Sequence, residues 1–310
     1  MTPTLSPVHF RFTSEHAEFG SPGIEPPGRS AEDAAIGKSL ITFLLIALVG
    51  YAALVVFMYF SQRSILFPGA GSEPPPAPQW GEAVAIPTPD GETLHALYSA
   101  ARPGKPSVLF FLGNADWPGN FAFLARALGS QGIGLLALSY RGYPGSTGSP
   151  SEAGLLTDGL AAFDWLSAQD GGGIVLLGQS LGSGVAVNTA AERPAAGVVL
   201  ISAYLSVLSV AQAQYRFLPV AQLIRDPFRS DLRIAKVKQP KLFIHGRRDT
   251  VIPLSSGEAL YRIAPEPKRM LIDDASGHND IWSDGLTAEI VRFVEASASG
   301  GRIPGDPSSP

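Results

Sequence analysis

The sequence predicts an α/β fold with a mostly parallel, doubly wound sheet over residues 82–297. Short apolar runs, of the length of buried strands, alternate there with longer segments that have helical spacing. Strands buried on both faces appear as continuous apolar runs, as parallel strands do. The segments between them then supply crossover helices that cover both faces of the sheet.

The individual elements follow from the same pattern. Residues 82–100 are expected to form two strands joined by the turn Pro89-Asp90-Gly91. Further strands are expected at 107–113, 133–140, 173–179, 197–204, 241–246 and 269–274. Helices are expected at 121–132, 152–169, 180–193, 255–264 and 286–297.

An uncharged apolar segment precedes this domain. Residues 40–60, LITFLLIALVGYAALVVFMYF, are long enough to cross a bilayer core of about 30 Å as one helix. We expect a transmembrane helix over 39–61 rather than a cleaved signal peptide, because the run is long and no small-residue cleavage site follows. Arg29 and Lys38 precede the span and only Arg63 follows closely, so we expect the C-terminal domain on the non-cytoplasmic side.

The remaining segments are expected to lack regular structure. Residues 1–38 are rich in proline, glycine and acidic residues without periodicity and are predicted to be disordered. Residues 62–81 form a Pro-rich linker, and 298–310 a flexible tail.

Composition excludes several classes of function. The formal charge of −4 and the lack of a basic block argue against a nucleic-acid partner. The chain has no cysteine, which removes thiol catalysis, disulfides and thiolate metal sites. No clustered His, Asp or Glu residues have ligand spacing and no nucleotide motif is present, so we expect neither a metal nor a cofactor.

The stretch LLGQSLGSG, residues 176–184, is the strongest candidate for a catalytic motif. Because the chain has 34 glycines, a Gly-x-Ser-x-Gly match alone is weak and needs a strand before it and a helix after it. Both are predicted here. Gly178 and Gly182 then allow the sharp turn that exposes Ser180, the candidate nucleophile.

A serine nucleophile needs a base and an orienting carboxylate. His278 lies in a Gly-containing loop after the last predicted strand, whereas His245 falls within an apolar strand and is better explained as a core residue. Asp249 is the preferred acid, with Asp273 and Asp274 as alternatives. The order Ser180, Asp249, His278 is that of α/β-hydrolases.

Seven stretches of this sequence closely resemble the single-span α/β-hydrolases of the bud-emergence (Bem) type. The resemblance extends to α/β-hydrolase-domain proteins described as lysophospholipase-like, monoglyceride-lipase-like or serine aminopeptidase-like, and covers about residues 60–297. The stretches, in family order, are QRSILFPG, LGNADW, SYRGYPGSTGSPSEAGLLTDGLAAFDWL, LLGQSLGSGVAVNTA, LIRDPF, FIHGRRDTVIP and GHNDIW.

The resemblance implies the same three catalytic residues, Ser180 as nucleophile, Asp249 as acid and His278 as base. An oxyanion hole is expected from the backbone N–H groups of Leu181 and of Asn114, with Ala115 as the alternative to Asn114. The sequence departs from the family at Leu112, where a histidine usually precedes the Gly-Asn pair. That change removes no backbone donor, but it removes a side chain that can brace the loop.

The sequence therefore predicts a membrane-anchored serine hydrolase that cleaves acyl esters through an acyl-enzyme. A non-catalytic binding or scaffold protein on the same fold is the alternative from another class, and a peptidase is a third. Residues 205–237 are long for a crossover and apolar in their first half. They are expected to form either a lid over the site or an ordinary crossover helix.

Overall fold

The computed structural model describes residues 31–74, 79–169 and 172–300. The chain divides into two compact units, Met1–Leu54 and Val55–Pro310. The predictions for residues 1–30 and 301–310, and for part of the Pro-rich stretch, lie outside the described residues.

The N-terminal apolar segment is helical. Helix α1 (Ala31–Leu66) extends beyond the predicted 39–61 at both ends, into residues assigned above to a disordered tail and to a linker. Glu32 and Asp33 lie in its first turn, where their charge is favourable to the helix dipole. The helix ends just before Pro68, which cannot continue it. Its apolar window has a mean hydropathy of 2.7, and none of that window is buried.

Eight strands of the described residues form one sheet in the order β1-β2-β4-β3-β5-β6-β7-β8. Strand β1 pairs antiparallel with β2, and β2 antiparallel with β4, while the remaining pairs are parallel. The bounds are β1 Glu82–Pro87, β2 Thr93–Ser99, β3 Ser107–Phe111, β4 Gly134–Leu138, β5 Ile174–Gln179, β6 Gly197–Ile201, β7 Lys241–Gly246 and β8 Lys268–Asp273. The mostly parallel, doubly wound sheet predicted from the sequence is confirmed.

The strand order reverses at β3. The chain passes from β3 outward to β4 and then returns to the other side of β3 for β5. In open α/β sheets, the crevice outside the carboxyl ends of the strands at such a reversal is where ligands bind. A ligand site is therefore expected among the residues that follow β3 and β5.

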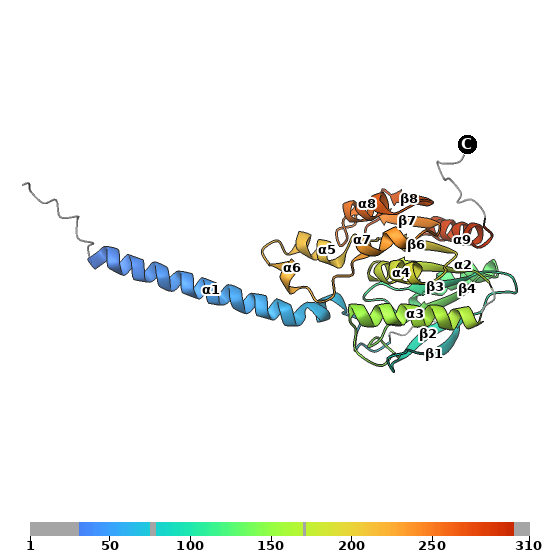
Figure 1. Cartoon of the computed structure of the whole chain (residues 1–310), viewed down its shortest axis with the longest axis horizontal. Helices are drawn as coiled ribbons and strands as arrows, with labels where there is room; N and C mark the ends of the chain where they lie inside the picture. The colour runs from blue at the N-terminus through green and yellow to red at the C-terminus, as the bar shows by residue number, and fades with distance from the viewer. Residues whose placement is uncertain (1–30, 75–78, 170–171, 301–310) are drawn as a thin grey trace, which may run out of the picture. The chain divides into compact units, whose positions relative to one another are not determined.

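Helices cover both faces of the sheet (Figure 1). Buried side chains of α3, α4 and α8 share one apolar cluster with alternate strand residues. Side chains of α2 and α9 form the cluster on the opposite face. The bounds are α2 Ala122–Ser130, α3 Glu152–Gln169, α4 Leu181–Glu192, α8 Leu254–Ile263 and α9 Asp284–Ala298.

The segment between β6 and β7 carries three short α-helices, α5 (Val207–Gln214), α6 (Val220–Leu223) and α7 (Ser230–Arg233). The short 3-10 helices are η1 (Pro118–Phe121) and η2 (Ile234–Lys236). None of the α5 residues is buried, so α5 is not a conventional crossover helix packed on the sheet. Figure 1 shows α5 and α6 beside the C-terminal end of α1.

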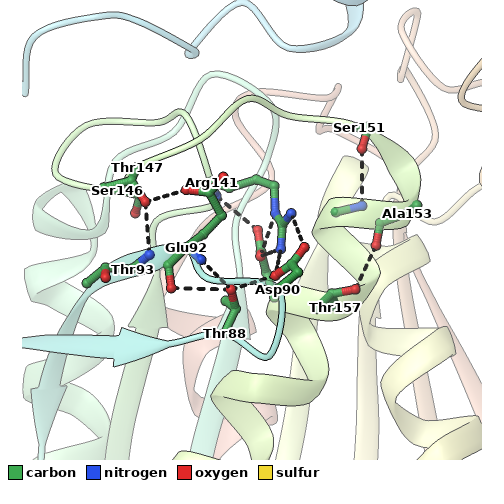
Figure 2. A network of polar contacts seen from close by, with 12 residues as sticks. Thr88, Asp90, Glu92, Thr93, Arg141, Ser146, Thr147, Ser151, Ala153 and Thr157 are labelled. Atoms are coloured by element: carbon green, nitrogen blue, oxygen red, sulfur yellow. Dashed lines mark hydrogen bonds and ion pairs between the residues drawn. The ribbon is translucent and has the colours of Figure 1, made fainter.

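A buried ionic network fixes the loop between β4 and α3 (Figure 2). The Arg141 guanidinium donates through Nε to Asp158 on α3 at 2.8 Å and through its terminal nitrogens to Asp90 at 2.7 and 3.0 Å. Asp90 lies in the turn between β1 and β2, so one side chain connects three separate parts of the chain. The Asp158 carboxylate is fully buried, which makes this connection structurally important.

Candidate active site

Ser180 lies at the tight turn between β5 and α4, beside the end of β3. Its backbone has φ 51° and ψ −119°, a conformation that non-glycine residues rarely adopt. Glycine is required on both sides of it. A Cβ atom on Gly178 would lie 2.6 Å from the Gly182 carbonyl oxygen, and one on Gly182 would collide with the Phe111 carbonyl. The hydroxyl of Ser180 is thereby presented at the crevice where the strand order reverses.

His278 and Asp249 lie in line with this hydroxyl. His278 Nε2 is 2.9 Å from Ser180 Oγ, and His278 Nδ1 is 2.7 Å from Asp249 Oδ2. Asp249 follows β7 and His278 follows β8, so both come from loops at the carboxyl edge of the sheet. The structure thus brings together the three residues that the sequence singled out, although they span 98 positions of the chain.

The Asp249 carboxylate is held in its ionised form. Its other oxygen accepts hydrogen bonds from the backbone N–H groups of Val251 and Ile252, at 2.9 and 2.8 Å. Burial alone would raise the pKa of Asp249, but the hydrogen bonds from His278 and Ile252 outweigh it and leave the pKa below its usual value. An ionised carboxylate at this position can orient the imidazole and stabilise its protonated form.

The alternative acids make other contacts. Asp273 accepts hydrogen bonds from the Ala275 N–H and the Ser276 hydroxyl, within its own loop. Asp274 is exposed and pairs with Arg247. His245 is buried, and its Nε2 lies 2.9 Å from the Ile252 carbonyl, which can only accept. His245 therefore packs behind the Asp249 loop, as a core residue.

The expected oxyanion donors also border the site. Leu181 is the first residue of α4, where helix N–H groups have no partner within the helix, and Asn114 follows the end of β3. Leu112, which stands in place of the usual histidine, is buried among apolar residues.

Two tyrosines brace the loop that carries Asn114. Tyr140 donates to the Leu112 carbonyl at 2.9 Å, and Tyr143 donates to the Asn114 carbonyl at 2.8 Å. Neither tyrosine was singled out from the sequence, although Tyr-Arg-Gly-Tyr begins at the last residue of the predicted strand 133–140 and could have drawn attention to them.

A cavity of about 280 Å³ opens beside Ser180. Asn114 and Leu181 also line it, but most of its wall is apolar and comes from the segment 204–224 and from the end of α1. The lid alternative for residues 205–237 implies that Phe217, in their apolar first half, covers the site. The Phe217 side chain is instead 60% exposed and does not line the cavity, whereas the neighbouring Leu218 does. Among the residues that the structure describes, no cluster of His, Asp or Glu could hold a metal ion.

Comparison with known proteins identifies the family. The sequence profile of the alpha/beta hydrolase family matches residues 103–287. The chain belongs to the α/β-hydrolase family. The match spans the crevice residues after β3, the Ser180 turn and the His278 loop, so the α/β-hydrolase assignment applies to the part of the chain that builds the site.

Relatives of this α/β-hydrolase include proteins from bacteria and animals. An uncharacterized protein of Mycobacterium tuberculosis is 39% identical over 254 residues, which cover 78% of this chain and 89% of the relative. The lysophosphatidylserine lipase ABHD12 of Xenopus tropicalis is 32% identical over 219 residues, which cover 64% of this chain and 55% of the lipase.

Solved structures show the same fold. An esterase of Pyrococcus furiosus has a TM-score of 0.57 and 19% identity, and the match covers 72% of this chain and 96% of the esterase. An esterase of Exiguobacterium antarcticum has a TM-score of 0.54 and 16% identity, with 69% and 99% covered. At these identities the likeness concerns the α/β-hydrolase fold alone.

Proposed function

We propose that this α/β-hydrolase is a membrane-anchored serine hydrolase that cleaves carboxylic esters of lipid-like acyl chains. The observation that carries the proposal is the continuous contact from Ser180 Oγ through the His278 imidazole to the Asp249 carboxylate, at 2.9 and 2.7 Å. Serine becomes a nucleophile when an adjacent base can take its proton and a third group orients that base.

The reaction has two balanced halves. Ser180 Oγ attacks the ester carbonyl while its proton passes to His278 Nε2, and the resulting oxyanion faces the N–H groups of Leu181 and Asn114. The intermediate collapses to an acyl-enzyme as the alcohol leaves with the proton from His278. A water molecule then repeats the sequence, releasing the acid and restoring Ser180.

The membrane part of the proposal rests on α1. Its window of mean hydropathy 2.7 is unburied, which a core helix would not be. The bias of basic residues toward the N-terminal side of the span favours a catalytic domain on the non-cytoplasmic side. An apolar cavity beside Ser180 and the lipase activity named for the frog relative both favour acyl-chain substrates.

The geometry of the loop after β3 favours catalysis over a non-catalytic scaffold role. The departure at Leu112 was the one sequence feature that favoured a non-catalytic protein. Hydrogen bonds from Tyr140 and Tyr143 hold the carbonyls on either side of Gly113, so the loop is braced without the usual histidine. A catalytic oxyanion hole therefore remains compatible with this loop.

The test is covalent labelling with a fluorophosphonate probe, together with hydrolysis of p-nitrophenyl esters. The full-length protein is expected to label and to turn over esters, and Ser180→Ala is expected to do neither while keeping its melting temperature within a few degrees, because only a hydroxyl is removed. A protein that is folded yet neither labels nor hydrolyses any ester would contradict the proposal. Labelling that persists in Ser180→Ala would place the nucleophile elsewhere.

A further inference from the structure

The cavity beside Ser180 has a wall that comes from the anchor helix itself. Met58, Tyr59, Gln62, Ile65 and Leu66, all near the C-terminal end of α1, line it. The opposite wall comes from α5, α6 and the turn between them. Its apolar members include Val207, Val210, Leu218, Val220 and Leu223, together with Ile224 directly after α6. The two walls are separated by about 150 residues of sequence, so nothing in the local pattern indicates that they share a cavity.

Hydrogen bonds join these two walls. The Gln62 side chain donates to the Leu223 carbonyl at 3.1 Å and accepts from the Arg225 N–H at 2.8 Å. Arg63 makes a two-point ion pair with the buried Asp226, at 2.8 and 3.1 Å. Paired contacts of this kind fix orientation as well as distance. The end of α1 is therefore part of the catalytic unit.

The same end of α1 is tied to the loop after β3. The Asn114 side chain donates to the Leu66 carbonyl at 3.1 Å, and the Gly69 N–H donates to the Asn114 carbonyl at 3.2 Å. Asn114 is one of the proposed oxyanion donors. The end of α1 thus borders both the apolar cavity and the polar side of the site.

We propose that residues Met58–Leu66 of α1 form one wall of the acyl-chain site and, with α5 and α6, set the chain length that the enzyme accepts. The inference rests on the proposed esterase function. The occupant is the acyl chain, because the cavity leads from Ser180 between apolar walls. The cavity has a volume of about 280 Å³, just below the range of roughly 300–1,000 Å³ that is usual for ligand pockets.

The position of this wall has a physical rationale. The apolar run ends at Phe60, and the first charged residue after it is Arg63, so the apolar span is expected to leave the bilayer within the cavity-lining segment. An acyl chain that enters between α1 and α5–α6 then passes from lipid into a protein cavity with little exposure to water. Each methylene that it buries favours binding by up to about fourfold.

The experiment compares Met58→Trp with Phe57→Trp in the full-length protein, reconstituted in liposomes. Met58 lines the cavity, whereas Phe57 is 63% exposed and does not, so the same residue type is introduced on two faces of one helix turn. The readout is the ratio of kcat/KM for p-nitrophenyl octanoate to that for the acetate. We expect Met58→Trp to lower this ratio roughly tenfold or more, as the loss of two buried methylenes implies, and Phe57→Trp to leave it unchanged.

A second variant covers the case in which the tryptophan does not fit. Met58→Ala enlarges the cavity and is expected to shift the preferred ester to a longer chain, the opposite direction. Equal ratios in wild type, Met58→Trp and Phe57→Trp, or an unshifted preference in Met58→Ala, would overturn the inference while wild-type labelling and turnover left the esterase function standing. A wild-type protein that neither labels nor hydrolyses esters would overturn both.

Discussion

At the scale of single residues, the site combines a strained backbone at Ser180 with an Asp249 carboxylate that accepts hydrogen bonds on both of its oxygens. The φ of 51° at Ser180 costs a non-glycine residue on the order of 1–3 kcal/mol, so contacts with the surrounding structure must hold the residue in this conformation. The Ser180 N–H donates to the Ile201 carbonyl at 2.9 Å, while Gly182 admits the close approach of the end of β3 and Gly178 that of α4. The hydroxyl is consequently held toward His278 before any substrate arrives.

Asp249→Asn tests the role of the carboxylate. We expect turnover to fall by about 10⁴-fold, because the amide can donate to the imidazole and so favours the wrong tautomer. Asp273→Asn is the matched control, since its carboxylate bonds within the same edge of the sheet but does not contact His278. Ester hydrolysis under saturating conditions measures both. A larger loss in Asp273→Asn would show that the acid was assigned wrongly.

The effect of Asp249→Asn on the stability of the fold is expected to depend on pH. The pKa of Asp249 in the folded protein lies below its usual value, so ionisation stabilises the fold above the unfolded pKa of about 3.9 and this contribution is lost as the pH falls through the folded pKa. The gap in melting temperature between wild type and Asp249→Asn is expected to narrow below about pH 4. A gap that stays constant through that range would contradict the assigned shift.

At the scale of elements, the helices and strands of the catalytic domain are joined at the carboxyl edge of the sheet by loops that brace one another. Arg141 connects the β1–β2 turn and α3, and its neighbours Tyr140 and Tyr143 hold the loop after β3. The network around Arg141 therefore stabilises the loops that border the site, and Ser180 is not part of it.

Arg141→Met is expected to destabilise the fold by about 3–5 kcal/mol, because Asp158 keeps a buried carboxylate without its partner. That corresponds to a fall in melting temperature on the order of 10 °C for a domain of this size. Arg193→Met is the control, since its pair with Asp164 is exposed and is expected to contribute about 1 kcal/mol or less. Thermal unfolding measures both, and equal losses would contradict this view of the network.

The elements that were predicted from the sequence can each be recognised from a short, continuous stretch of residues. Each buried strand is a continuous apolar run, and the Gly-x-Ser-x-Gly turn carries its own steric requirement. What the sequence missed depends on contacts between distant segments. Tyr143 donates to Asn114, and Gln62 donates to Leu223, the last residue of α6 and 161 residues away, so no local pattern reports either contact.

The direction of the Phe217 side chain also depends on contacts that no local pattern reports. Phe217 and Phe228 are both phenylalanines of the 205–237 segment, yet Phe217 is exposed and Phe228 is buried, so apolar size does not say which way a side chain faces in an irregular segment. The helix bounds of α1 also differ from prediction, because hydropathy marks the apolar window alone. The helical residues on either side include the charged residues Glu32, Asp33, Lys38 and Arg63.

At the scale of the whole molecule, the chain is expected to cross a membrane once, and the lack of cysteine provides a direct test. Ser299→Cys introduces a thiol at an exposed position after α9, and Thr4→Cys introduces one near the N-terminus. With a membrane-impermeant maleimide, spheroplasts should label Ser299→Cys at once and Thr4→Cys only after permeabilisation. The reverse pattern would contradict the orientation, and immediate labelling of both would contradict the span.

The contribution of Met58–Leu66 to the cavity has a consequence for how proteins of this architecture can be recombined. A chimera that joins this catalytic domain to a foreign anchor at residue 66 exchanges one side of the pocket along with the membrane segment, and it also changes the partners of Leu223 and Asp226. The end of the anchor helix and the hydrolase domain therefore build the cavity together. A change of membrane segment by gene fusion would at the same time alter substrate preference.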